Sequence, residues 1–291
     1  MSNAGYFPRG DSVLRMVHGE RAVGLLYGQR ALMIGALNPL TFIGTIENTA
    51  GRLRPFRRLA HTGKIFEQVM FGTRAEADEA LVFVHHLHER VSGTLPEDAG
   101  AHRAGTPYSA FDPELMLWTL AVIADSGPYF YELFARRLSS EEHERLWQDY
   151  VRFGELFGMP RGVAPRSHPE FRDWWEAKLA SEEMHLTEEA RRVGYATAFE
   201  IPLPASHQPA KRVHDLIMLG SLPPRVRELY GLSWSAAHAV AFAALVRSAR
   251  LSRPLAPRAL RRGSSTEAYD LVARTERQRI ERGRPTPQVA G

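Results

Sequence analysis

Hydrophobic positions along the chain recur mainly at three- and four-residue spacing, the period of an α-helix that buries one face. This pattern predicts helices over Ala22–Leu37 and Pro55–Met70, and a central helix, apolar almost all round, over Leu115–Ala124. No stretch alternates apolar and polar residues with the composition of a strand, and there is no fixed-period repeat. The sequence therefore predicts an all-α protein, a single globular domain of about ten helices.

The helix that begins at Ala75 carries three histidines in its last turns. At 100° per residue its core-facing stripe consists of Ala77, Ala80, Leu81, Val84, His88 and Val91. We expect His88 near the middle of this stripe, His85 on its flank and His86 pointing toward water. Gly93 is a suitable residue to stop the helix.

A histidine on an apolar helix face has two interpretations. In the first, His88 is a core residue whose ring bonds to a neighbour, because an unpaired buried polar group costs about 1–3 kcal/mol. In the second it binds a metal ion or haem iron, since neutral imidazole is the commonest protein ligand for such ions. The spacing of residues does not choose between the two.

A second polar group lies on the helix predicted over Pro55–Met70. Arg58, His61 and Thr62 stand at positions i, i+3 and i+4, so they share one side of that helix. On spacing alone such residues are more often surface residues than a site. If the helix lay over a haem, their donors would suit stabilisation of charge on bound oxygen.

Composition and motifs exclude several classes of site. The chain of 291 residues has no cysteine, which excludes disulfides, thiolate nucleophiles, iron–sulfur clusters and thiolate-ligated haem. One Glu-x-x-His motif is present, Glu182 to His185, where a di-iron bundle needs two. A His-Glu-x-x-His motif, a Gly-rich phosphate loop and a Gly-x-Ser-x-Gly elbow are absent.

The charge pattern bears on partners and location. The formal net charge is +4, and arginines concentrate in residues 250–262 and 274–284. We interpret these as a solvated tail first, and as a contact for an acidic surface or nucleic acid second. The apolar run Ala31–Ile46 contains Pro39 and is short for a membrane span, and Met1–Asp11 lacks a signal-peptide pattern. We therefore expect a cytoplasmic protein without a transmembrane segment, and no nucleic-acid partner.

Several motifs in order resemble the oxygenase MpaB / latex-clearing-protein (rubber oxygenase) family. The segments that carry the resemblance are Phe56–Thr62, Phe71–Ala77, His85–Gly93, Tyr108–Trp118 and Gly154–Pro160. The similarity extends over roughly Asp11 to Tyr230, which is most of the chain.

The resemblance implies an all-α fold, globin-like in general character, that encloses a b-type haem and uses dioxygen. It implies that His88 is the proximal iron ligand and that Arg58 and Thr62 lie on the distal side, with His85 also against the haem. His61 stands where the family has Lys or Arg, as an acid/base group or a sixth iron ligand.

Other positions also differ from the family pattern. His85 stands where Arg is common, Ser92 where latex-clearing proteins carry another Arg, and Asn38 where a His often precedes the proline. These differences leave the proximal ligand in place and change the distal surroundings.

The sequence thus predicts a haem b-dependent oxygenase in which Arg58, His61 and Thr62 act on dioxygen and a small apolar substrate, with alkenes as one class. The catalytic domain is expected over 1–255, followed by an arginine-rich segment, 256–291, that is at most partly ordered. Two alternatives stay open: a non-catalytic haem sensor or carrier, and a helical interaction protein without cofactor. The oligomeric state is not predicted.

Overall fold

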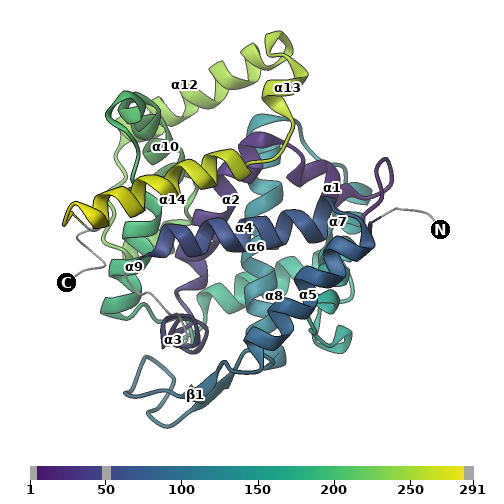
Figure 1. Ribbon diagram of the computed structural model, residues 1–291, viewed down its shortest axis with the longest axis vertical. Coiled ribbons are helices and arrows are strands. Elements are labelled where there is room, and N and C mark those ends of the chain that lie inside the picture. Colours follow the sequence, from purple (N-terminus) through teal and green to yellow (C-terminus); the bar gives the residue numbers. More distant parts are fainter. Residues whose placement is uncertain (1–4, 48–53, 285–291) are drawn as a thin grey trace.

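The computed structural model describes residues 5–47 and 54–284. Within these ranges the chain forms fourteen α-helices and one two-stranded hairpin, which confirms the predicted all-α class (Figure 1). The helices are α1 (Val13–His18), α2 (Arg21–Gly35), α3 (Pro39–Glu47), α4 (Pro55–Phe71), α5 (Arg74–His88), α6 (Pro113–Phe134), α7 (Ser140–Leu156), α8 (His168–Ala180), α9 (Glu188–Phe199), α10 (Gln208–Ser221), α11 (Pro224–Leu229), α12 (Ala236–Ser252), α13 (Arg258–Arg261) and α14 (Thr266–Glu281). The number exceeds the expected ten or so, partly because α13 is too short to show a helical period in sequence.

Two long helices, α2 and α6, pack on each other at the centre of the molecule (Figure 1). The indole Nε1–H of Trp118 on α6 donates to the carbonyl of Gly35 at the end of α2, at 3.0 Å. The sequence predicted that this helix ends at Ala124, and the predicted end was wrong: α6 continues through Pro128 to Phe134. Arg30 of α2 binds Asp125 at 2.7 Å and Ser126 at 2.8 Å, so the residues before the proline are held against α2.

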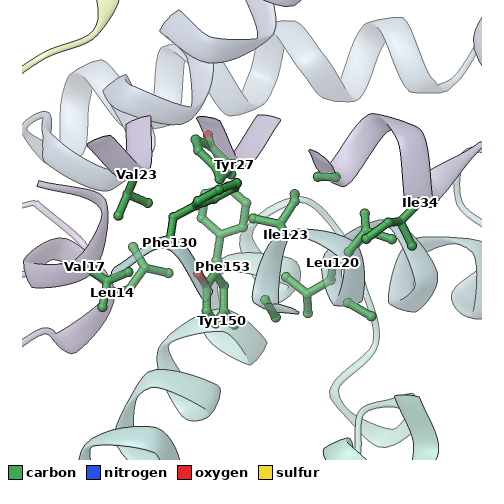
Figure 2. Close-up of a cluster of buried hydrophobic side chains, with 14 of the residues drawn as sticks. Leu14, Val17, Val23, Tyr27, Ile34, Leu120, Ile123, Phe130, Tyr150 and Phe153 are labelled. Carbon is green, nitrogen blue, oxygen red and sulfur yellow. The ribbon is translucent and has the colours of Figure 1, made fainter. Parts of the chain in front are cut away.

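The main hydrophobic core lies where α1, α2, α6 and α7 meet. Figure 2 shows side chains from all four helices pointing into one cluster. Those labelled are Leu14, Val17, Val23, Tyr27, Ile34, Leu120, Ile123, Phe130, Tyr150 and Phe153. One polar ring is enclosed beside them: His18 lies 2.8 Å from the Tyr150 hydroxyl, measured from Nε2.

Helices α4 and α5 form an antiparallel pair joined by a two-residue turn. Pro55 opens α4 in its first turn, as the sequence predicted. Thr73 caps α5 and forms a capping box with Glu76. From this turn the two helices diverge toward their far ends, where α4 begins and α5 ends (Figure 1).

The far end of α5 differs from the sequence prediction. The helix ends at His88, and Gly93 lies instead in strand β1 (Ser92–Thr94), which pairs antiparallel with β2 (Pro107–Ser109). Strands of three residues are too short to show an alternating pattern, so the sequence did not reveal them. The region between the two strands is the tip of this hairpin.

The segment beyond residue 255 contributes a long helix to the same body. Helix α14 runs antiparallel to α4 and lies alongside it (Figure 1). The Oε atoms of Glu67 near the end of α4 bind residues 264–266 at the start of α14. A domain boundary near residue 255 stays a prediction.

Candidate functional site

The five predicted site residues divide between two neighbouring helices. Arg58, His61 and Thr62 lie in the first turns of α4, and His85 and His88 lie in the last turn of α5. Because the helices are antiparallel, these turns stand at the same end of the pair, where the helices diverge (Figure 1). We call these five residues the α4–α5 site.

His88 lies at the end of its helix stripe and is only half-buried. Ala77, Ala80 and Val84 of the stripe are buried as predicted, but the helix stops at His88, before Val91, and the ring is half-buried where a core position was expected. Its Nδ1 atom is inaccessible to solvent and has no hydrogen-bond partner among the residues that the structure describes. Burial lowers the pKa of this imidazole, and the charges of His85 and Arg58 lower it further. His88 is therefore held neutral, the form that binds metal ions.

The aromatic ring of Phe111 joins the two histidines of α5. It packs edge-on against His88 at 5.8 Å between ring centroids, and at a tilt against His85 at 4.9 Å. His85 is exposed, and its Nε2 lies 3.7 Å from a carboxylate oxygen of Glu89. His86 is exposed as well, as predicted. Of the three histidines, only His88 has a ring nitrogen enclosed by protein.

Arg58 connects the start of α4 to α3. Its Nη1 donates to the backbone carbonyl of Thr45 at 2.7 Å, which holds one side of the guanidinium in place. The charge of Arg58 contributes, after burial and the charge of His85, to the lowered pKa of the His88 imidazole. Thr62 follows one turn later and is half-buried.

His61 occupies a different position from Arg58 and Thr62. Its side chain is exposed, and its ring meets the Phe83 ring of α5 edge-on at 5.5 Å between centroids. Phe83 and Leu87 are themselves largely exposed, so apolar surface lies uncovered beside the histidines. The site therefore combines exposed imidazoles, one enclosed imidazole, one cation and an apolar surface.

Sequence reasoning missed Phe111 and Thr45. Phe111 directly precedes Asp112, the cap of α6, and its contact with α5 depends on the hairpin that turns the chain back. Thr45 contributes only a backbone oxygen, which no side-chain pattern indicates. Asn38, noted for its departure from the family pattern, is buried and its Oδ1 accepts the Thr41 N–H at 3.0 Å, which caps α3.

The donor set suits a group held by one axial imidazole rather than a bare metal ion. Among the residues that the structure describes, no three His, Asp or Glu side chains gather as a metal-binding group. A b-type haem needs one or two axial ligands and burial of its porphyrin by apolar surface. His88, with its neutral imidazole and orphaned Nδ1, and the uncovered Phe83 and Leu87 fit those needs.

Comparison with known proteins supports an oxygenase-type function. Residues 15–251 match the family model described as ER-bound oxygenase mpaB/B'/Rubber oxygenase, catalytic domain. Uncharacterized proteins of Mycobacterium bovis and Mycobacterium tuberculosis are each 27% identical over 205 residues, which is 70% of this chain and 76% of theirs. No solved structure matches the chain.

The described ranges contain no helix with both the length and the hydrophobicity that a membrane crossing requires. The matched region includes the whole α4–α5 site and ends in α12. Since the family model covers well over half of the chain, the protein belongs to the MpaB/rubber oxygenase family, through its catalytic domain.

Proposed function

We propose that this protein is a haem b-dependent oxygenase that uses dioxygen on a small apolar substrate. The observation that carries the proposal is the half-buried imidazole of His88, with a solvent-inaccessible Nδ1 and a lowered pKa, within a matched oxygenase domain. We assign His88 to the iron and His85 to the haem's edge, where Phe111 contacts both rings. Bound haem would supply the activation of dioxygen, which amino-acid side chains do not provide.

Arg58 and Thr62 are the donors that we assign to the reacting oxygen atoms. Arg58 offers a positive charge and several N–H groups, and its bond to Thr45 limits its movement. Thr62, one helical turn on, offers a hydroxyl in a half-buried position. Fixed donors of this kind stabilise negative charge as it develops on oxygen during a reaction.

His61 is the residue that we assign to proton transfer. Its ring is exposed to solvent and packs edge-on against Phe83. Imidazole is the side chain most often used as a general acid or base. The apolar surface of Phe83 and Leu87 supports an apolar substrate, with alkenes as the class suggested by family analogy.

The test is an optical spectrum of the protein, produced with haem precursor, in oxidised and dithionite-reduced forms. The wild type should show a Soret band, and His88→Ala should lose it. His86→Ala is the matched control, because His86 lies on the same helix turn and is exposed. That variant should keep the band.

Each outcome has a definite meaning. A Soret band retained in His88→Ala would contradict the ligand assignment, and no band in any protein would contradict haem dependence. If haem binds through His88, product analysis with dioxygen and an apolar alkene then tests the oxygenase activity. Haem bound without turnover of any such substrate would contradict that activity.

A further inference from the structure

Residues 236–262, which comprise α12, α13 and the turn between them, combine positive charge with exposed apolar side chains. We call this segment the α12 edge. It contains six arginines and no aspartate or glutamate. The family match ends at residue 251, so residues 252–262 of this segment lie beyond the matched domain.

One face of α12 points outward along its whole length. Val240, Ala244, Arg247 and Leu251 follow one another at four- and three-residue spacing, so they share that face, and all four are exposed. The opposite side holds Phe242, which packs over Gly220 of α10. In Figure 1 α12 lies at the outer edge of the molecule.

The apolar side chains of the α12 edge are unusually exposed. Relative exposure is 70% for Leu251, 86% for Leu255 and 67% for Leu260. An open, mostly apolar hollow of about 440 Å³ lies on α12, lined by Phe242, Ala243, Val246, Arg247, Arg250 and Leu251. An exposed apolar surface rimmed by charged side chains marks a contact with a partner or a membrane.

Most of the positive charge of this edge is not neutralised by the contacts that the structure shows. Arg253 and Arg262 share the single buried carboxylate of Glu20, at 2.9 and 3.2 Å. Arg250 donates to the backbone carbonyls of residues 132 and 133, which carry no net charge. Arg247 and Arg258 are exposed. The edge therefore presents a clear positive excess.

We propose that the α12 edge binds the surface of a lipid bilayer that contains anionic headgroups. Leucines that enter the acyl boundary, flanked by arginines that meet phosphate groups, are the physical basis of interfacial membrane binding. Charge complementarity favours an anionic bilayer, and the exposed leucines favour lipid over nucleic acid, whose binding needs charge rather than aliphatic surface. This surface is separate from the α4–α5 site, and the proposal does not depend on haem.

The experiment is co-sedimentation of the full chain with vesicles. One set contains phosphatidylcholine alone, and the other contains phosphatidylcholine with an equal amount of phosphatidylglycerol. The wild type should pellet with the anionic set and stay in solution with the neutral set. The double variant Leu251→Ser, Leu255→Ser should bind the anionic vesicles at least roughly tenfold more weakly than the wild type. Because both side chains are exposed, this variant should fold normally.

Two further variants separate the contribution of charge from that of apolar surface. Arg247→Gln with Arg258→Gln should weaken binding and reduce its dependence on salt. Val213→Ser on α10 is the matched apolar control, since Val213 is 46% exposed outside the edge, and it should bind as the wild type does.

Three results would overturn the proposal. The first is equal pelleting of the wild type and the leucine variant, or no pelleting of either. The second is a wild-type dimer in solution that the leucine variant dissociates, which would assign the face to a second copy. The third is binding of duplex DNA that competes with vesicles and that the leucine variant retains.

Discussion

The carboxylate of Glu276 accepts a hydrogen bond from the backbone N–H of Phe56, at 3.1 Å across 220 positions of sequence. Its second oxygen accepts the N–H of Arg57 at 2.9 Å. A helix start leaves its first N–H groups without partners, and no side chain of the preceding Arg54 caps α4. Glu276 of α14 therefore supplies the cap for the helix that carries Arg58, His61 and Thr62.

Replacing Glu276 with alanine should destabilise the protein by about 1–3 kcal/mol. The change leaves two N–H groups at the start of α4 unpaired, one of them on buried Phe56. Urea unfolding of wild type and variant measures the loss. Glu281→Ala on the same helix is the control. Because the Glu281 carboxylate is exposed, its removal should change the free energy of unfolding by less than about 0.5 kcal/mol. Equal effects of both changes would contradict the capping role.

The same residue should make stability depend on pH. Desolvation raises the pKa of Glu276 above its usual 4.5, although the hydrogen bonds from Phe56 and Arg57 oppose the rise. The folded state then binds more protons than the unfolded state, so this group's contribution to stability falls as pH rises from 4.5 through the raised pKa. Relative to Glu276→Gln, the wild type should lose stability over that range. If the wild type instead gained stability as the pH rises, the hydrogen bonds to Glu276 would outweigh its desolvation.

Gly63 allows α14 to approach α4 closely. A Cβ at this position would meet Cε2 of Tyr269 at 2.6 Å, and the Tyr269 hydroxyl is anchored on the carbonyl of Gly24. Gly63→Ala should therefore lower the free energy of unfolding by roughly 1–2 kcal/mol, despite the better helix propensity of alanine. Gly162→Ala is the control, because a Cβ there meets nothing within 4 Å. No difference between the two variants in thermal unfolding would contradict this packing.

The helices of the site could be predicted from sequence because their signals are local. Pro55 and the apolar face placed α4 to within one residue of its observed end at Phe71. The end of α5 could not be placed in this way. It depends on the pairing of Ser92 with Ser109, a contact between segments that no helical period encodes.

Sequence could predict only those parts of the candidate site whose side chains are placed by helix spacing. Arg58 and Thr62 share a side of α4, and His88 shares a side of α5 with Ala77 and Val84, as the period predicts. The ring of Phe111 and the carbonyl of Thr45 reach the site only because the chain folds back and brings them beside His88 and Arg58. Their roles, and that of Glu276, arise from tertiary packing and leave no pattern in the local sequence.

His61→Ala should lower turnover with an apolar substrate by roughly 10²-fold while haem binding is unchanged. The His61 ring is packed on Phe83 and exposed to solvent, which suits proton transfer rather than iron ligation. Steady-state turnover and the ferric spectrum, measured on the same sample, separate these roles. A change from a low-spin to a high-spin spectrum in the variant would instead identify His61 as a sixth ligand. His61→Lys is the companion variant, because lysine restores a proton donor at this position.

Acidification should destabilise the protein through His18, which lies in the core beside Tyr150. Burial lowers the pKa of this imidazole to about 3, against 6.5 for the usual side chain. Between these values the unfolded state binds one more proton, so stability falls on acidification by about 1.4 kcal/mol per pH unit. Urea unfolding across this range should show a shallower dependence in His18→Gln than in wild type. His86→Gln, an exposed control, should follow the wild type. Parallel profiles for wild type and His18→Gln would mean that other groups govern the acid response, and that the His18–Tyr150 contact tolerates a charged ring.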